Sequence, residues 1–144
     1  MITKEKEEAV KLIKKYKTNN PFEIAEHKKI QIFYCDLKEL RGMYRYYKRN
    51  KQIFINSTLP DYTQKLVCGH ELGHAIFHPN LNTPFFESNT FFSKNKLEIQ
   101  ANRFAIELLL PDYIINNYPE YTLEQIARVE CLPIELIRLK YGSY

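Results

Sequence analysis

Two histidines and a glutamate form the pattern His-Glu-x-x-His within the stretch from Cys68 to His78. If this stretch is helical, His70 and His74 lie four residues apart, so both imidazoles leave one face about 6 Å apart along the axis. That spacing suits two nitrogen ligands of one Zn²⁺ ion. Glu71 is turned by about 100° on the helical wheel, where its carboxylate can reach a water on the metal without being a ligand. The pattern therefore predicts hydrolytic zinc chemistry, in which two neutral imidazoles hold the metal and one carboxylate takes a proton from the water that the metal acidifies.

The alternative interpretation is an amphipathic helix with two solvated histidines, because a five-residue match can arise by chance. Two observations favour the zinc site. Two of the four histidines in the chain occupy the motif positions. The motif also lies in a strongly apolar helical stretch that contains Leu66, Val67, Leu72, Ala75, Ile76 and Phe77.

A third metal ligand has to come from elsewhere, because a catalytic zinc needs three protein ligands and one open position. Glu98, 24 residues after His74, is the candidate, on a helix predicted over residues 96–110. Asn102 lies four residues further on the same face. A metal-bound histidine donates its other N–H to an oxygen acceptor, and we expect Asn102 to be that acceptor for His70. The alternative for Glu98 is a surface glutamate on an ordinary helix.

His78 competes for the third ligand position, since it shares a helix face with His70 and His74. About 12 Å of helical rise separates His70 from His78, which one tetrahedral ion with bonds of about 2 Å cannot span. A bend at the helix end before Pro79 keeps this alternative open. We expect His78 instead to interact with the last carbonyls of the helix.

The composition is that of an ordinary soluble protein, with 144 residues, 44% apolar and 26% charged. No stretch approaches the length of a membrane span, and the charged N-terminus lacks the apolar region of a signal peptide. Three widely spaced cysteines, Cys35, Cys68 and Cys131, make neither a disulfide framework nor a C-x-x-C metal site. We therefore expect a cytoplasmic protein with reduced cysteines. For Cys68, a packing role is favoured over a redox-sensitive thiol.

The charge is unevenly distributed along the chain. Residues 1–60 carry 14 Lys+Arg and 7 Asp+Glu, whereas residues 61–144 carry 7 and 10. A basic half could contact nucleic acid or an acidic partner. The alternation of lysine and glutamate in the first helix favours a solvated face instead.

The periodicity predicts an α+β fold, in which helices cover one face of a small antiparallel three-stranded sheet. The predicted strands span residues 30–34, 42–47 and 52–56, with a hairpin turn at 49–51. Helices are predicted over residues 3–17, 21–27, 60–77, 96–110, 112–118, 122–127 and 133–140. Residues 79–95 contain four phenylalanines and are expected to form a loop that rims the substrate cleft.

The motif helix Cys-Gly-His-Glu-Leu-Gly-His-Ala-Ile-Phe-His and the later Glu-Ile-Gln-Ala-Asn-Arg-Phe-Ala-Ile-Glu-Leu-Leu-Leu-Pro resemble the ImmA/IrrE family of metallopeptidases. The resemblance spans about residues 28–118. It implies a zincin-like fold and an intracellular zinc endopeptidase. Its implied substrate is a helix-turn-helix repressor of a phage or mobile element.

Carried over by position, the resemblance makes His70, His74 and Glu98 the zinc ligands and Glu71 the general base. Family members often have Glu where this chain has Gln100, which leaves Glu98 as the less ambiguous ligand. The oxyanion-stabilising residue stays open, with Tyr113 or a strand tyrosine as candidates.

We expect residues 1–144 to form a single zincin-like metallopeptidase domain, with a catalytic core at 28–118 and a C-terminal helical extension at 119–144. Residues 122–140 resemble a helix-turn-helix, but Cys131 stands where the turn usually has glycine. The second helix also has few polar side chains that could read bases. A helical pair that packs on the core or docks a partner is therefore favoured over DNA binding.

Two other functions are compatible with these residues. A non-catalytic regulator could retain the fold and sequester a repressor or DNA through residues 122–140. A structural zinc domain would instead use four protein ligands.

Overall fold

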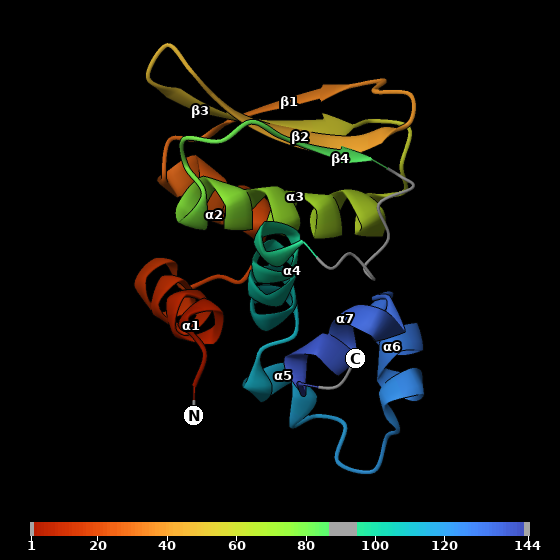
Figure 1. Cartoon of the computed structure of the whole chain (residues 1–144). Coiled ribbons are helices and arrows are strands. Elements are labelled where there is room, and N and C mark those ends of the chain that lie inside the picture. Colours follow the sequence, from red (N-terminus) through yellow and green to blue (C-terminus); the bar gives the residue numbers. More distant parts are fainter. Residues whose placement is uncertain (1, 87–94, 143–144) are drawn as a thin grey trace.

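The computed structural model describes residues 2–86 and 95–142, which form a sheet with helices packed on one of its sides (Figure 1). In chain order the elements are α1 (Lys4–Tyr16), α2 (Pro21–His27), β1 (Gln31–Cys35), β2 (Leu40–Tyr47), β3 (Asn50–Asn56), α3 (Asp61–Phe77), β4 (Thr83–Phe86), α4 (Lys96–Leu109), α5 (Asp112–Ile115), α6 (Leu123–Glu130) and α7 (Ile134–Lys140). The α+β class is as predicted. The predicted helices are present within a few residues of their expected ends, including the C-terminal helical pair.

The sheet differs from the prediction of three antiparallel strands. Its order is β1-β3-β2-β4, and β1 runs parallel to β3 while the other pairs are antiparallel. The additional strand β4, Thr83–Phe86, lies within the stretch expected to be a loop, whose residues 87–94 lie outside the described part. β4 contains Pro84 and is an edge strand, the position in a sheet that tolerates proline.

The hairpin between β2 and β3 turns one residue earlier than predicted. Tyr47 pairs with Asn50, so Lys48 and Arg49 form a two-residue loop. Both have positive φ, 48° and 65°. Two left-handed residues match the twist of the flanking strands and make this a tight hairpin despite the missing glycine.

α3 is sandwiched between the sheet and α4 (Figure 1). It begins at Asp61, directly after Pro60. The negative charge of Asp61 suits the positive N-terminal end of the helix dipole. Gly42 of β2 lies against α3, because a Cβ at this position would come within 2.5 Å of Val67 Cγ1. The same Cβ would lie 3.5 Å from Glu71 Cγ. The missing side chain thus lets β2 pass directly over the His-Glu-x-x-His turn.

Two apolar clusters hold the helices together. One joins α1, α2, the inner face of the sheet, α3 and α4, and its largest buried side chains are Tyr44 and Phe104. The other joins α4 to the C-terminal helices through Ile106, Ile126 and Leu136. α4 belongs to both clusters, so its position relative to α3 is fixed from two sides. Across residues 2–86 and 95–142, no helix is long and apolar enough to cross a membrane.

Candidate metal centre

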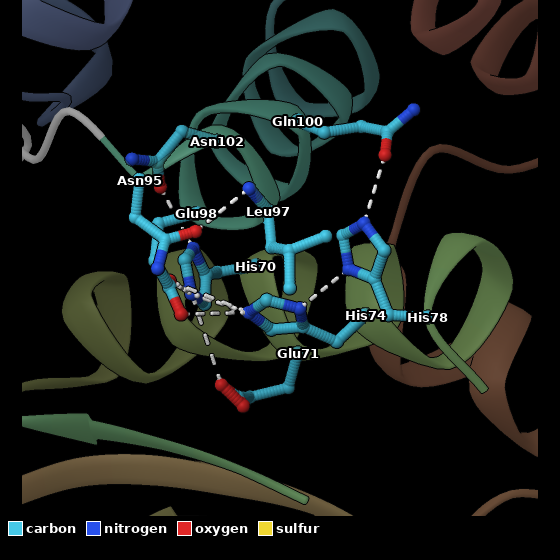
Figure 2. Close-up of polar contacts among 9 residues, drawn as sticks. All are labelled: His70, Glu71, His74, His78, Asn95, Leu97, Glu98, Gln100 and Asn102. Carbon is cyan, nitrogen blue, oxygen red and sulfur yellow. Dashed lines mark hydrogen bonds and ion pairs between the residues drawn. The ribbon is translucent and has the colours of Figure 1, made fainter. Parts of the chain in front are cut away.

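The histidines of the motif converge in the interior of the protein (Figure 2). His70 and His74 are both fully buried on α3. Their Nε2 atoms face each other at 3.2 Å. The helical spacing predicted from the sequence therefore brings two nitrogen donors to one point.

Glu98 reaches the same point from the first turn of α4. Its Oε2 lies 2.8 Å from His70 Nε2, and its Oε1 lies 3.3 Å from His74 Nε2. The helix begins at Lys96 because the Asn95 side chain accepts a hydrogen bond from the Leu97 amide. This cap places Glu98 at the helix end that packs across α3.

The three donors fit an ion of the size of Zn²⁺. Ligands at zinc–ligand distances of about 2.0–2.1 Å in a tetrahedron lie about 3.3 Å from one another. Among Glu98 Oε2 and the two Nε2 atoms the observed separations are 2.8, 3.2 and 3.3 Å. Two imidazole nitrogens and one carboxylate are also the ligand types that zinc prefers.

Glu71 points from α3 toward the sheet, away from α4 (Figure 2). It is fully buried, and neither of its oxygens has a hydrogen-bond partner among the described residues. Burial, and secondarily the charge of Glu98, raises the pKa of Glu71 well above its usual value. Its Oε1 is 3.9 Å from His70 Nε2. A buried carboxylate without a partner among these residues is costly, which points to a further group at this site.

The electrostatics favour a cation between these groups. Burial opposes ionisation of Glu98, but hydrogen bonds from His70 and His74 outweigh it and hold the pKa of the carboxyl well below its usual range. Burial lowers the pKa of His74, with Glu98 opposing this effect. A charged carboxylate and a neutral imidazole are the forms that bind a metal.

The other nitrogen of His70 meets Asn102. Asn102 Oδ1 lies 2.7 Å from His70 Nδ1, and both side chains are buried. The contact that we expected from the spacing on α4 is present, while its effect on metal binding stays a prediction. On the sheet side, the Phe85 ring of β4 stacks on His70 at 4.1 Å between ring centroids.

The other nitrogen of His74 meets His78, which the sequence did not lead us to expect. The backbone N–H of His78 bonds the His74 carbonyl, as expected at a helix end, but its side chain turns back so that the two Nδ1 atoms lie 2.9 Å apart. His78 Nε2 in turn lies 2.8 Å from Gln100 Oε1. Neither His78 nor Gln100 is among the atoms that meet at the proposed metal position. The four-residue spacing from His74 to His78 was the signal in the sequence that could have suggested the contact between these two histidines.

Neither Tyr113 nor Cys68 is among the donors that meet at this point. Tyr113 is on α5, at the end of α4 far from α3 (Figure 1), and is 55% exposed. Cys68 is fully buried, and burial raises the pKa of its thiol well above the usual value. It therefore packs as an apolar side chain in the core, since a reactive cysteine needs exposure and an accessible thiolate.

The chain is similar to known proteins over most of its length. The family model described as the IrrE N-terminal-like domain, Peptidase_M78, matches residues 25–134. The chain is 50% identical to "Uncharacterized immunity region protein 2" of Bacillus phage phi105 over 133 residues, which cover 90% of this chain and 84% of the relative. It is 39% identical to "Metallopeptidase ImmA" of Bacillus subtilis (strain 168) over 122 residues, which cover 81% and 71%. Residues 25–134, which the family model matches, contain α3, β4 and α4, whereas α1 lies before them.

Proposed function

Because the chain belongs to the IrrE N-terminal-like family of metallopeptidases, we propose that it is a zinc-dependent endopeptidase. Family membership confirms the ImmA/IrrE resemblance and, with the observed α+β structure, the zincin-like fold. The observation that carries the proposal is the meeting of His70 Nε2, His74 Nε2 and one carboxylate of Glu98 within 3.3 Å. The carboxylate of Glu71, which has no hydrogen-bond partner among the described residues, lies 3.9 Å from His70 Nε2.

In the proposed mechanism His70, His74 and Glu98 hold the metal, and Glu71 moves the proton. Zinc bound to these three residues would supply Lewis-acid chemistry, since it lowers the pKa of a water molecule to about 7 and polarises a peptide carbonyl. Glu71 accepts the proton of the attacking water on a carboxylate oxygen. It then delivers that proton to the nitrogen of the leaving amine.

The surroundings of Glu71 suit this double role. Burial raises the pKa of its carboxyl, which makes Glu71 a stronger proton acceptor than an exposed glutamate. Asn102 holds the ring of His70 through Nδ1, and Phe85 covers the face of that ring. Both contacts keep Nε2 of His70 directed at the metal position.

We infer that the substrate is a helix-turn-helix repressor in the cytoplasm. The support is the family resemblance and the name of one relative, which places that protein in a phage immunity region. A repressor encoded next to this protein is therefore the substrate to test.

The test is to mix the purified, zinc-loaded protein with the neighbouring repressor and to identify fragments by mass spectrometry. Wild type should produce two fragments from one bond, and a zinc chelator or Glu71→Gln should abolish them. Loss of repressor activity without fragments, persisting in Glu71→Gln, would instead favour a regulator that sequesters the repressor. Equal cleavage by wild type and Glu71→Gln would rule out the proposed role of the glutamate.

A further inference from the structure

A line of hydrogen bonds leaves the metal centre at His74 and ends on the first helix of the chain. His74 Nδ1 lies 2.9 Å from His78 Nδ1, and His78 Nε2 lies 2.8 Å from Gln100 Oε1 (Figure 2). The Gln100 side-chain amide then donates to Glu5 Oε2 at 3.3 Å. Four side chains from α3, α4 and α1 are connected in this way.

The proton positions along this line follow from one condition, that His74 binds the metal through Nε2. The lone pair of Nε2 is then used, so the ring carries its proton on Nδ1 and donates it to His78 Nδ1. His78 must accept there, so its own proton is on Nε2, which donates to the Gln100 oxygen. The Gln100 amide is left to donate to Glu5. Each contact in the line then joins one donor to one acceptor.

The line is shielded from water at its His74 end and reaches a half-buried side chain at Gln100. His74 is fully buried, and His78 and Glu5 are each 7% exposed. Removing His78 would therefore leave Nδ1 of the fully buried His74 without its partner. The line ends on the carboxylate of Glu5, which accepts from the Gln100 amide. An acceptor at this end polarises the N–H groups along the line and makes the imidazole of His74 a stronger ligand for a cation.

We propose that His78, Gln100 and Glu5 are positioning residues of the metal centre. They hold His74 in the tautomer protonated on Nδ1, with Nε2 directed at the ion, and they make α1 part of the centre although it lies outside the matched residues 25–134. This inference rests on the proposed function, since it assumes that His74 is a metal ligand. It assigns these three side chains a role that acts through His74, without contact to metal or substrate.

The first test measures zinc affinity of the purified full-length chain by competition with a chromophoric chelator. His78→Ala should lower the affinity about 10–100-fold, the range for loss of a group that supports a metal ligand. His78→Gln should restore most of it, because its oxygen can accept from His74 and its amide can donate to Gln100. Glu5→Ala should weaken binding less than His78→Ala, and Glu7→Ala should leave it unchanged, because Glu7 is an exposed acid on the same helix.

The second test reads the tautomers directly by nitrogen NMR of the zinc-loaded wild type. The proton should be on Nδ1 in His74 and on Nε2 in His78. The opposite tautomer of His78, or zinc affinities of His78→Ala and Glu5→Ala equal to that of wild type, would overturn the inference. If His78→Ala does not fold, as judged by circular dichroism, the comparison of Glu5→Ala with Glu7→Ala decides. A wild type that binds no zinc would overturn the proposed function as well, whereas a wild type that binds and cleaves with unaffected variants would overturn only the positioning role.

Discussion

Gly73 of α3 lies directly against Ala101 of α4. A Cβ at position 73 would come within 3.0 Å of Ala101 Cα and 3.1 Å of its carbonyl oxygen. These are backbone atoms that cannot turn away. Gly73 precedes His74, and Ala101 lies one helical turn after Glu98, so this contact sets the spacing between two of the proposed ligands.

Gly73→Ala should separate the two helices at the metal centre. The added methyl group has to push the α4 backbone outward, and such overpacking costs about 1–3 kcal/mol. We expect a lower free energy of unfolding and weaker zinc binding. Chemical denaturation of the metal-free protein and chelator competition measure the two effects.

Gly69→Ala is the matched control, one turn earlier on the same helix. Its nearest contact would be Ala105 Cβ at 3.5 Å, an ordinary van der Waals distance. Higher helix propensity should then leave stability unchanged or raise it by up to about 1 kcal/mol. A larger loss for Gly69→Ala than for Gly73→Ala would contradict the contact described here.

Glu71→Gln should separate catalysis from metal binding. We expect cleavage to fall about 100–10,000-fold, the contribution of a general base, with zinc affinity close to that of wild type. The metal-free variant should be no less stable than wild type, because burial already disfavours the charged form of Glu71 and the amide that replaces it is neutral. Fragment yield, chelator competition and denaturation test these three expectations, and a less stable metal-free variant would count against them.

Asn102 should matter through the oxygen that it presents to His70. Asn102→Leu removes the acceptor and should weaken zinc binding about 10–100-fold. Asn102→Asp keeps an oxygen at the same place and should retain more of the affinity. Equal affinity of the leucine variant and wild type, with both folded, would show that the contact at 2.7 Å does not orient the ring.

Zinc should stabilise the folded protein by mass action. At a concentration about 1,000 times Kd, a ligand that binds only the native state adds about 4 kcal/mol to the free energy of unfolding. A scan of Tm against free zinc should therefore rise steadily for wild type and stay flat for His74→Ala. A flat wild-type curve would exclude a native-state zinc site.

Asp112 should link stability to pH on the acid side. A hydrogen bond from Lys6, and less strongly the charge of Lys140, lowers the pKa of Asp112 below its ordinary 3.8, although burial opposes this. The contribution of Asp112 to the free energy of unfolding is therefore complete above its ordinary pKa. It is lost as the pH falls through the lowered pKa of the folded state. The stability difference between wild type and Asp112→Asn should shrink over that window, and it should not exceed about 1 kcal/mol because the side chain is 59% exposed. A difference that grows toward low pH would have the wrong sign.

The long helices could be predicted because each has a strong local signal. The apolar periodicity and the flanking prolines defined α3, and the four-residue spacing of Glu98 and Asn102 put both side chains on one face of α4. That this face meets α3, as the contacts of both residues show, was expected only because Glu98 was predicted to complete a zinc site with His70 and His74.

The sheet could be predicted only in part, because strand partners are decided by tertiary packing. The residues of β1 have high strand propensity, yet nothing in them specifies that β1 pairs in parallel with β3 instead of continuing into β2. Likewise, the spacing of His74 and His78 gives a shared face and not a side-chain rotamer. The side chain of His78 contacts Gln100 of α4, which in turn contacts Glu5 of α1, and the sequence does not show that these helices meet.

The division of the site between α3 and α4 also has a consequence in time. Ribosomes add about 5–20 residues per second, so the chain carries His70 and His74 before Glu98 and Asn102 have been made. A nascent chain that ends within the β4 region then lacks the carboxylate of Glu98 and the Asn102 side chain that contacts His70. Under the proposed ligand set, peptidase activity arises only after α4 has been synthesised and has packed across α3, which keeps unfinished chains from cleaving proteins around them.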